Sequence, residues 1–290
     1  MKRFVCLDVG GTEIKAALVG EDGALRSGIL RFSSRAKEDR ETILGHIASV
    51  VRSAAGAESA DGVRFAFPGP FDYENGVCLV EGLDKFDAIF GVNLRWELAG
   101  RLDPDEGGTD IRFVNDAAAF GMGEAAFGEV GMTGRALCVP IGTGCGSVFL
   151  INGLPVGEEI PGVPKSGYIY DTPFLDGYID DCLSKRGLVR LSSEILGVPL
   201  EGRELAEAAG NGTPGARKVW RIFGERLRDA LSPFLVPDGF APSVLCLGGQ
   251  IMKSAALFAD PIRECCASLG VRLLIEEDTS RRVLQGLTRI

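Results

Sequence analysis

The 290-residue sequence predicts an α/β protein built from two related lobes. Short apolar runs rich in β-branched residues alternate with segments of helical periodicity, a pattern typical of sheets covered by helices. A unit made of a strand, a glycine-rich turn and a second strand occurs twice along the chain. The length also suits two domains of ordinary size.

The first copy of this unit opens the chain. Residues 4–8 form a β-rich run, which two glycines and a threonine interrupt at 10–12. The run resumes at 14–19, and after a turn we expect a third strand over 25–32. Apolar runs separated by short turns of this kind indicate antiparallel hairpins.

The second copy lies near the middle of the chain. A β-rich run at 136–141 is broken by the glycines of 142–146, and a further strand at 147–151 leads into the hairpin turn Asn152-Gly153. Repetition of one supersecondary unit predicts two related lobes that face each other.

The segments between and after the two copies complete the lobes. Helices are expected at 39–55, 117–127 and 215–235, and further strands at 63–67, 111–114 and 244–247. Because strands and helices alternate, we expect mostly parallel pairing at the centre of each sheet. The first lobe is expected over 1–116 with a C-terminal return over 276–290, and the second over 117–275.

Composition and charge exclude several classes of partner. The chain carries 31 Lys and Arg against 40 Asp and Glu, a net charge of −9. So acidic a protein has no evident basic surface for nucleic-acid phosphates, and a nucleic-acid partner is not expected. No apolar stretch approaches the roughly 18 residues of a membrane span, and Asp8 ends the first apolar run too early for a signal peptide. We therefore expect a cytoplasmic protein without a membrane partner.

The cysteines indicate packing rather than chemistry. Eight are present, and several lie inside apolar runs, which favours buried reduced thiols over a redox role. The sequence has no Cys-x-x-Cys pair, and His46 is its only histidine. A Cys/His zinc site is therefore not expected.

The first glycine turn has the composition of a phosphate-binding loop. Gly10 and Gly11 let a phosphate approach the backbone, whose free N–H groups can hold an anion, and Thr12 adds a hydroxyl donor. Asp8 ends the preceding strand, where it could hold Mg²⁺ through water. A plain Gly-Gly hairpin is the alternative interpretation.

Two further glycine turns belong to the second half of the chain. Gly142-Thr143-Gly144 repeats the glycine–threonine pattern, and one such clamp from each lobe would hold a triphosphate across a cleft. Gly248-Gly249 follows a buried strand and removes side chains, so that a base or ribose could lie on the backbone. A tight strand-to-helix turn explains these two glycines equally well.

Asn115-Asp116 lies between a predicted strand and a predicted helix. A carboxylate at this point is directed into a cleft at the strand ends, and the helix N-terminus favours its charged form. In phosphoryl transfer such an Asp can accept the proton of the attacking hydroxyl. The alternative is a helix N-cap, which Asn or Asp often supplies.

Four motifs together resemble one known family. They are Asp8-x-Gly10-Gly11-Thr12-x-x-Lys15, Asn115-Asp116-Ala117, Gly142-Thr143-Gly144-x-Gly146 and Leu247-Gly248-Gly249. Their order and spacing are similar to those of the ROK family of repressors, uncharacterised frames and sugar kinases, over nearly the full chain. The resemblance implies the two-lobed actin-like (ribonuclease H-like) ATPase fold, with ATP and Mg²⁺ in the interlobe cleft. It also implies γ-phosphoryl transfer to a hydroxyl of a hexose or N-acetylhexosamine, commonly at carbon 6, and it allows a homodimer.

The same resemblance implies a role for each motif residue. Asp116 would be the catalytic base, and Asn115 would contact the sugar together with Gly69 and Asn93. The ATP-binding set would be Asp8, Gly10, Gly11, Thr12, Lys15, Gly142, Thr143, Gly144, Gly248 and Gly249, with Asp8 also holding Mg²⁺ through water.

Two motifs of the family are missing. ROK kinases usually carry Glu-x-Gly-His after the second hairpin, where the Glu and His contact the sugar, but residues 157–168 contain no histidine. A segment running from Tyr170 to Gly187 replaces the Cys-x-Cys-Gly-x-x-Gly-Cys zinc loop. The resemblance is thus to a zinc-free branch in which Glu158 or Glu159 replaces the lost sugar contacts. Alternatively, this segment is only a surface loop.

Two other functions stay open at this point. The chain could be a sugar or nucleotide sensor without catalysis, although it begins directly with a strand and leaves no room for a DNA-binding helix-turn-helix. It could also phosphorylate a non-sugar acceptor such as a small acid or polyphosphate. Retention of Asp116 favours an enzyme, because a sensor needs no base there.

Overall fold

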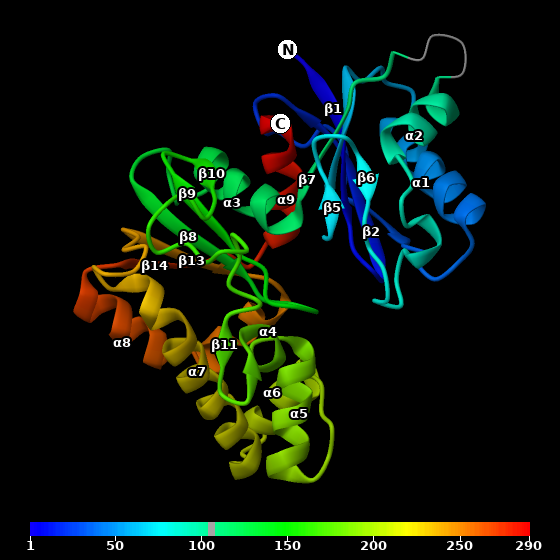
Figure 1. Ribbon diagram of the computed structural model, residues 1–290. Coiled ribbons are helices and arrows are strands. Elements are labelled where there is room, and N and C mark those ends of the chain that lie inside the picture. The colour runs from blue at the N-terminus through cyan, green and yellow to red at the C-terminus, as the bar shows by residue number, and fades with distance from the viewer. Residues whose placement is uncertain (104–107) are drawn as a thin grey trace. The chain divides into compact units, whose positions relative to one another are not determined.

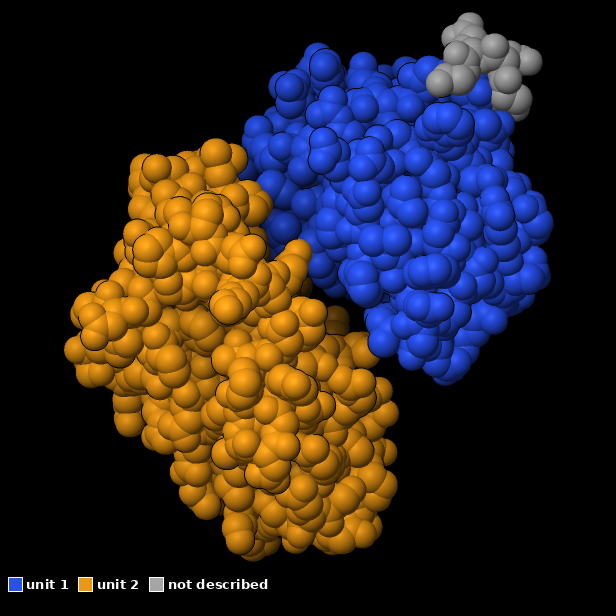
Figure 2. Space-filling view, in the orientation of Figure 1, with its two compact units in different colours: residues 1–128, 280–290 blue, residues 129–279 orange. Residues whose placement is uncertain are grey.

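The computed structural model describes residues 1–103 and 108–290. The chain divides into two compact units: unit 1 comprises residues 1–128 and 280–290, and unit 2 comprises residues 129–279 (Figure 2). Each unit contains a five-stranded sheet and a hydrophobic core of its own, so each is a mixed α/β domain.

The sheet of unit 1 has the strand order β3-β2-β1-β4-β7. Its strands are β1 (Arg3–Val9), β2 (Glu13–Gly20), β3 (Leu30–Ser33), β4 (Gly62–Phe67) and β7 (Ile111–Asn115), and a separate pair is β5 (Phe71–Asp72) with β6 (Val77–Cys78). β1, β2 and β3 form antiparallel hairpins, whereas β1, β4 and β7 run parallel. The carboxyl ends of the three parallel strands therefore lie at one edge of the sheet.

Helices pack on this sheet. They are α1 (Arg40–Ala55), α2 (Leu94–Leu102), α3 (Asp116–Phe127) and α9 (Thr279–Gly286), with the 3₁₀ turns η1 (Asp87–Ile89) and η3 (Leu287–Arg289). α1 begins at the N-cap Asp39, whose side chain accepts from Thr42 N, and it buries Ile43, Leu44 and Ile47 in the core. α2 packs beside α1, and α3 packs against β7 and η3 (Figure 1).

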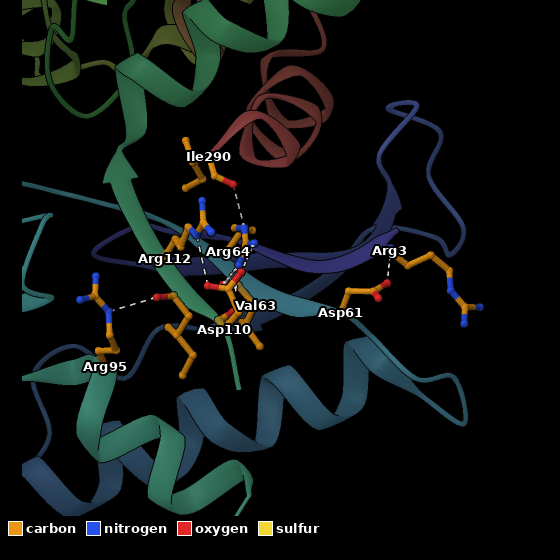
Figure 3. A network of polar contacts seen from close by, with 9 residues as sticks. Arg3, Asp61, Val63, Arg64, Arg95, Asp110, Arg112 and Ile290 are labelled. Atoms are coloured by element: carbon orange, nitrogen blue, oxygen red, sulfur yellow. Dashed lines mark hydrogen bonds and ion pairs between the residues drawn. The ribbon is translucent and has the colours of Figure 1, made fainter. Parts of the chain in front are cut away.

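A buried arginine ties the C-terminal residues into unit 1. Arg64 on β4 is 2% exposed, and its guanidinium lies 4.4 Å from the ring centre of Phe4. It pairs with the Asp110 carboxylate at 2.5 Å and donates to the backbone oxygen of Ile290 at 3.1 Å (Figure 3). Because a buried charge is costly unless it is paired, these contacts hold Ile290 against the sheet.

The sheet of unit 2 repeats the topology of unit 1. Its strands are β8 (Arg135–Pro140), β9 (Val148–Ile151), β10 (Leu154–Val156), β13 (Val244–Gly248) and β14 (Arg272–Ile275). The order β10-β9-β8-β13-β14 again places two antiparallel hairpins beside two parallel strands. The two-fold repetition predicted from the sequence is thus confirmed by the strand order.

Unit 2 is richer in helices than unit 1. They are α4 (Ile179–Cys182), α5 (Lys185–Leu196), α6 (Gly202–Gly210), α7 (Pro214–Leu235) and α8 (Asp260–Leu269), with the 3₁₀ segment η2 (Gln250–Leu257) and the small hairpin β11 (Pro173–Phe174) and β12 (Gly177–Tyr178). α7 packs against α5, α6 and α8, and its Trp220 is fully buried and stacks on Phe258 at 5.4 Å. This stack anchors the centre of the unit 2 core.

The structure differs from the sequence-based expectation in two places. The strand expected over 25–32 begins only at Leu30, because the Ser27 hydroxyl accepts from Leu18 N at 3.0 Å and so takes a donor that a longer strand would use. α3 lies in unit 1, whereas the expected lobe boundary falls at its first turn. A Cβ added at Gly123 of α3 would be 1.9 Å from the Arg282 backbone oxygen, so α3 and α9 are in close contact.

Two further observations concern the general class of protein. None of the helices in the described ranges is long and apolar enough to cross a membrane. Seven of the eight cysteines are buried, and only Cys265 is partly exposed. Burial raises the pKa of the Cys266 thiol to about 11, which makes it a weak nucleophile.

Candidate active site

Four of the predicted site residues lie at the carboxyl edge of the unit 1 sheet. Asp8 is near the end of β1, Gly69 follows β4, Asn115 ends β7 and Asp116 begins α3. Ligands bind open α/β sheets at this edge, because loops and helix N-termini converge there. The topology of unit 1 therefore places a carboxylate on each side of β4, the middle one of the three parallel strands.

Asp8 faces a lysine from the neighbouring strand. It lies opposite Lys15 in the β1–β2 register, and the Lys15 ammonium is 3.2 Å from the Asp8 carboxylate. Both side chains are largely buried, with 16% of Asp8 and 18% of Lys15 exposed. Lys15, predicted to bind the nucleotide, thus directs its charge to Asp8 and fixes the orientation of that carboxylate.

Asn115 is the N-cap of α3, as one of the two sequence interpretations had it. Its side-chain oxygen accepts from Ala117 N at 2.9 Å and from Ala118 N at 3.3 Å. Because Asn115 supplies the cap, the Asp116 carboxylate is not required for capping, and one of its oxygens accepts from Ala117 N at 2.9 Å. Its second oxygen stays available for chemistry.

The environment of Asp116 makes it a stronger base than an ordinary Asp. Loss of hydration around the carboxyl raises its pKa, and the negative charge of Asp8 raises it further. The N–H of Ala117 and the charge of Lys85 act in the opposite direction without cancelling the rise. Asp116 is nevertheless exposed to solvent, and a substrate hydroxyl can therefore reach it. A raised carboxyl pKa closer to neutral pH suits a general base.

The first glycine turn connects β1 to β2 and leaves backbone donors free. Gly10 N donates to Glu13 O at 2.9 Å, which closes the turn. Within the described part of the chain, neither Gly11 N nor Thr12 N donates a hydrogen bond, and both residues are exposed. Adjacent unpaired N–H groups can bind an anion, so this turn has the chemistry of a phosphate site.

Sequence reasoning missed Lys85, which lies on this turn. Its Cδ is 2.9 Å from the position that a Cβ on Gly11 would take. Lys85 belongs to the loop between β6 and α2, and no sequence motif marks it. Only the folding of that loop onto the turn brings the two together.

Tyr73 is a second residue that sequence reasoning missed. Its hydroxyl donates to Phe67 O at 3.0 Å and accepts from the Asn115 side-chain amide at 3.3 Å. The same hydroxyl is 3.5 Å from the position of a Cβ on Gly69, which precedes a cis bond to Pro70. Tyr73 thus links the predicted sugar residues Gly69 and Asn115.

Asn93 has a structural use in unit 1. It is the N-cap of α2, where its side-chain oxygen accepts from Trp96 N at 3.1 Å. Its amide nitrogen donates to Asn75 O at 3.1 Å. Both ends of the side chain are therefore engaged, and a sugar contact would have to compete with these bonds.

In unit 2 the second glycine turn follows β8. Gly142 N donates to Gly144 O at 2.9 Å, whereas no acceptor in the described ranges is bonded to Thr143 N or Gly144 N. Cys145 N donates to the Asp180 carboxylate at 2.6 Å, and Asp180 in turn pairs with Arg186 at 2.5 Å. Asp180 and Arg186, which belong to the segment from Tyr170 to Gly187, therefore brace the turn.

The third glycine turn is packed against the second. Gly248 pairs with Pro140 in the β8–β13 register, and Ile141 N donates to Gly248 O at 2.8 Å. Gly249 has φ 92° and ψ 172°, and a Cβ there would be 2.2 Å from Ile141 O. Backbone geometry and close approach both require glycine at this position.

Glu158 and Glu159 lie in the exposed loop that follows β10. Glu159 accepts from Gly157 N at 2.9 Å, and this bond lowers the pKa of its carboxyl. Both side chains are exposed, so either carboxylate can reach a ligand without rearrangement of the core. They belong to unit 2, as do the second and third glycine turns.

The donor set in unit 1 fits a hydrated Mg²⁺. Asp8 and Asp116 are close enough for one charge to raise the pKa of the other, and both carry oxygen ligands. Mg²⁺ typically binds through one or two carboxylates, several waters and substrate phosphates. In the residues that the structure describes, no group of three or more His, Cys, Asp and Glu is arranged to hold a metal ion.

The sequence matches one protein family over most of its length. The profile of the ROK family matches residues 4–283. The chain is 25% identical over 286 residues to the glucokinase of Thermotoga maritima, with 90% of this chain and 86% of that protein covered. It is 26% identical over 271 residues to the N-acetyl-D-glucosamine kinase of Haemophilus influenzae, with 87% and 85% covered.

Solved structures show the same fold. A ROK family glucokinase from Streptomyces griseus, crystallised with glucose and AMPPNP, superimposes with a TM-score of 0.79. The two sequences are 21% identical, and the alignment covers 99% of this chain and 98% of that one. The fold expected from the motifs is therefore confirmed.

Proposed function

The chain belongs to the ROK family, and on that premise we propose that it is an ATP-dependent sugar kinase that transfers the γ-phosphoryl group to a hydroxyl of a hexose or N-acetylhexosamine. One observation carries the proposal: Asp116 begins α3 at the carboxyl edge of the sheet, beside Asp8, with a raised pKa and an exposed face. A carboxylate so placed is suited to take a proton from a bound hydroxyl.

In this proposal the residues of unit 1 act on the acceptor. Asp116 accepts the proton of the sugar hydroxyl while the oxygen of that hydroxyl attacks the γ-phosphorus. The bond from the γ-phosphorus to the β–γ bridging oxygen breaks, which releases ADP. Asn115, fixed by the α3 cap and by Tyr73, is placed to orient the sugar together with Gly69. Asn93 is proposed as a further sugar contact; like Asn115 it is engaged as a helix N-cap, so a sugar would compete with the cap bonds at both residues.

The nucleotide is assigned to the glycine turns. Gly10, Gly11 and Thr12 offer unpaired backbone donors to phosphate oxygens, and Thr143 and Gly144 offer the same in unit 2. Gly248 and Gly249 are assigned to the adenosine; Gly248 is buried, whereas the backbone of the partly exposed Gly249 is open to a base or ribose. When bound, Mg²⁺ would neutralise phosphate charge, and Asp8 would hold it through water, oriented by Lys15.

The identity of the acceptor rests on relatives that are named glucokinase and N-acetyl-D-glucosamine kinase. We propose carbon 6 as the site of transfer and Glu158 or Glu159 as the carboxylate that replaces the missing family motif. The proposal also places the enzyme in the cytoplasm, where ATP is available and thiols stay reduced.

The test is ADP release from Mg·ATP in the presence of a panel of hexoses and N-acetylhexosamines. We expect one sugar to stimulate release and Asp116→Asn to lower kcat by about 10²–10⁴-fold. The affinity of the variant for Mg·ATP should change little. The exposed Asp238, which belongs to none of these motifs, provides the matched control Asp238→Asn.

Two results would contradict the proposal. Normal turnover by Asp116→Asn would remove the base assignment. An absence of sugar-stimulated release across the panel, with ATP still bound, would instead favour a sensor or a non-sugar acceptor.

A further inference from the structure

Lys85 is held in place by the segment that also holds the first glycine turn. The next residue, Phe86, is fully buried, with its ring centre 5.0 Å from that of Phe67. Phe86 N donates to Ala36 O at 2.6 Å, and two residues earlier the Ser34 hydroxyl donates to Gly11 O at 2.7 Å. The lysine and the turn are therefore fixed to one short stretch of backbone, and their contact does not depend on a flexible loop.

The charge of Lys85 is directed at the predicted reaction centre. Its aliphatic chain lies against Gly11, and its positive charge acts on the Asp116 carboxyl. The ammonium end therefore lies within electrostatic reach of both the turn assigned to phosphates and the residue assigned as base. In phosphoryl transfer the γ-phosphoryl group moves from the nucleotide, held at the turn, to the hydroxyl that the base deprotonates.

Two nearby lysines already have anionic partners, unlike Lys85. Lys15 pairs with Asp8 at 3.2 Å, and Lys37 pairs with Asp84 on the protein surface. Across residues 1–103 and 108–290, no carboxylate lies within ion-pair distance of the Lys85 ammonium. A partly buried cation gains from a counter-ion, so this position favours binding of an anionic ligand group.

We propose that Lys85 contacts the γ-phosphoryl group of ATP and stabilises the negative charge on its oxygens during transfer. This inference rests on the proposed kinase function and adds a catalytic residue to it. A fixed cation beside the transferred group lowers the barrier, because it needs no rearrangement as charge develops.

The test compares two nucleotides that differ in the γ-phosphate. Equilibrium binding of Mg·AMPPNP and Mg·ADP is measured for the wild type, Lys85→Met, Lys85→Gln and Lys85→Arg. For the Met and Gln variants we expect affinity for Mg·AMPPNP to fall by about tenfold, with affinity for Mg·ADP changed by less than about twofold. Lys85→Arg keeps the positive charge and should retain most of the preference. The surface variant Lys37→Met serves as the matched control and should behave as wild type.

Turnover with the best sugar gives a second measurement. Lys85→Met should lower kcat by about 10²–10³-fold, with a much smaller change in the KM for the sugar. Equal losses of affinity for Mg·AMPPNP and Mg·ADP in the Lys85 variants, or no loss for either nucleotide, would overturn the role of Lys85. The kinase assignment would remain intact as long as the wild type turns over. A wild type that binds neither nucleotide would overturn both.

Discussion

The first and second glycine turns occupy the same place in two sheets of the same strand order, yet opposite charges lie on them. Lys85 covers the first turn at Gly11, whereas the Asp180 carboxylate accepts from Cys145 N in the second. Both turns leave backbone donors unpaired, but at the first the protein adds a cation. In the second it uses its own carboxylate to fix the loop. The repeat therefore sets where a turn occurs, and residues far away in the sequence decide what the turn does.

The largest expected effect distinguishes a glycine required by the backbone from one required by its neighbour. Gly249→Ala places a Cβ 2.2 Å from Ile141 O at a φ of 92°, so we expect a loss of about 2–5 kcal/mol in the free energy of unfolding. Gly11→Ala meets only the flexible Lys85 chain at 2.9 Å, and stability should be nearly unchanged. Its Mg·AMPPNP affinity should instead fall by about threefold to tenfold, because Lys85 must shift.

Urea unfolding and nucleotide binding measure these two quantities separately. Gly45→Ala in α1, where nothing lies within 4 Å of an added Cβ, is the matched control for the stability measurement. If Gly11→Ala and Gly249→Ala lost the same free energy of unfolding, the distinction between the first turn, whose glycine is required by a neighbouring side chain, and the third, whose glycine is required by the backbone, would be wrong.

A smaller effect is expected at the brace of the second turn. Asp180→Ala removes the acceptor of Cys145 N and the partner of Arg186, which should cost about 1–2 kcal/mol of stability. Asp180→Asn keeps an oxygen at the same place and should cost less than half as much. Thermal unfolding of the two variants gives the comparison, and equal losses would show that the charge rather than the hydrogen bond holds the turn.

The smallest expected effect is a shift in pH dependence. Asp116 must be deprotonated to act as base, so kcat/KM falls as the pH drops through its pKa, which the loss of hydration around the carboxyl and the charge of Asp8 raise above the ordinary value. Because the charge of Lys85 lowers that pKa, Lys85→Met should move the acid limb to higher pH, and Lys37→Met should not move it. Lys15 is already paired with Asp8, and Ala117 N does not titrate, so neither masks the shift. An acid limb at the same pH in wild type and Lys85→Met would contradict the placement of this charge.

The features that the sequence could predict are local ones. Glycines after a β-rich run predict a turn because the backbone there needs their freedom, and Asn115-Asp116 predicts a helix start because the cap is a short-range bond. The fold class followed from such signals taken in order.

The features that were missed arise from tertiary contacts. Lys85 reaches Gly11 only because Phe86 enters the core and Ala36 accepts its N–H. Tyr73 and Asp180 likewise act on residues to which no sequence pattern connects them. A single sequence shows the spacing of residues along the chain, but it does not show which loop will pack on which turn.

The bond from Arg64 to Ile290 has a consequence for how the molecule is made. Unit 2 is one continuous stretch, but unit 1 is interrupted by it and needs residues 280–290 to be complete. During synthesis from the N-terminus, unit 2 can therefore finish folding while Arg64 still lacks one of its partners. The half of the protein that is synthesised first is the last to be finished, and the proposed base lies in that half.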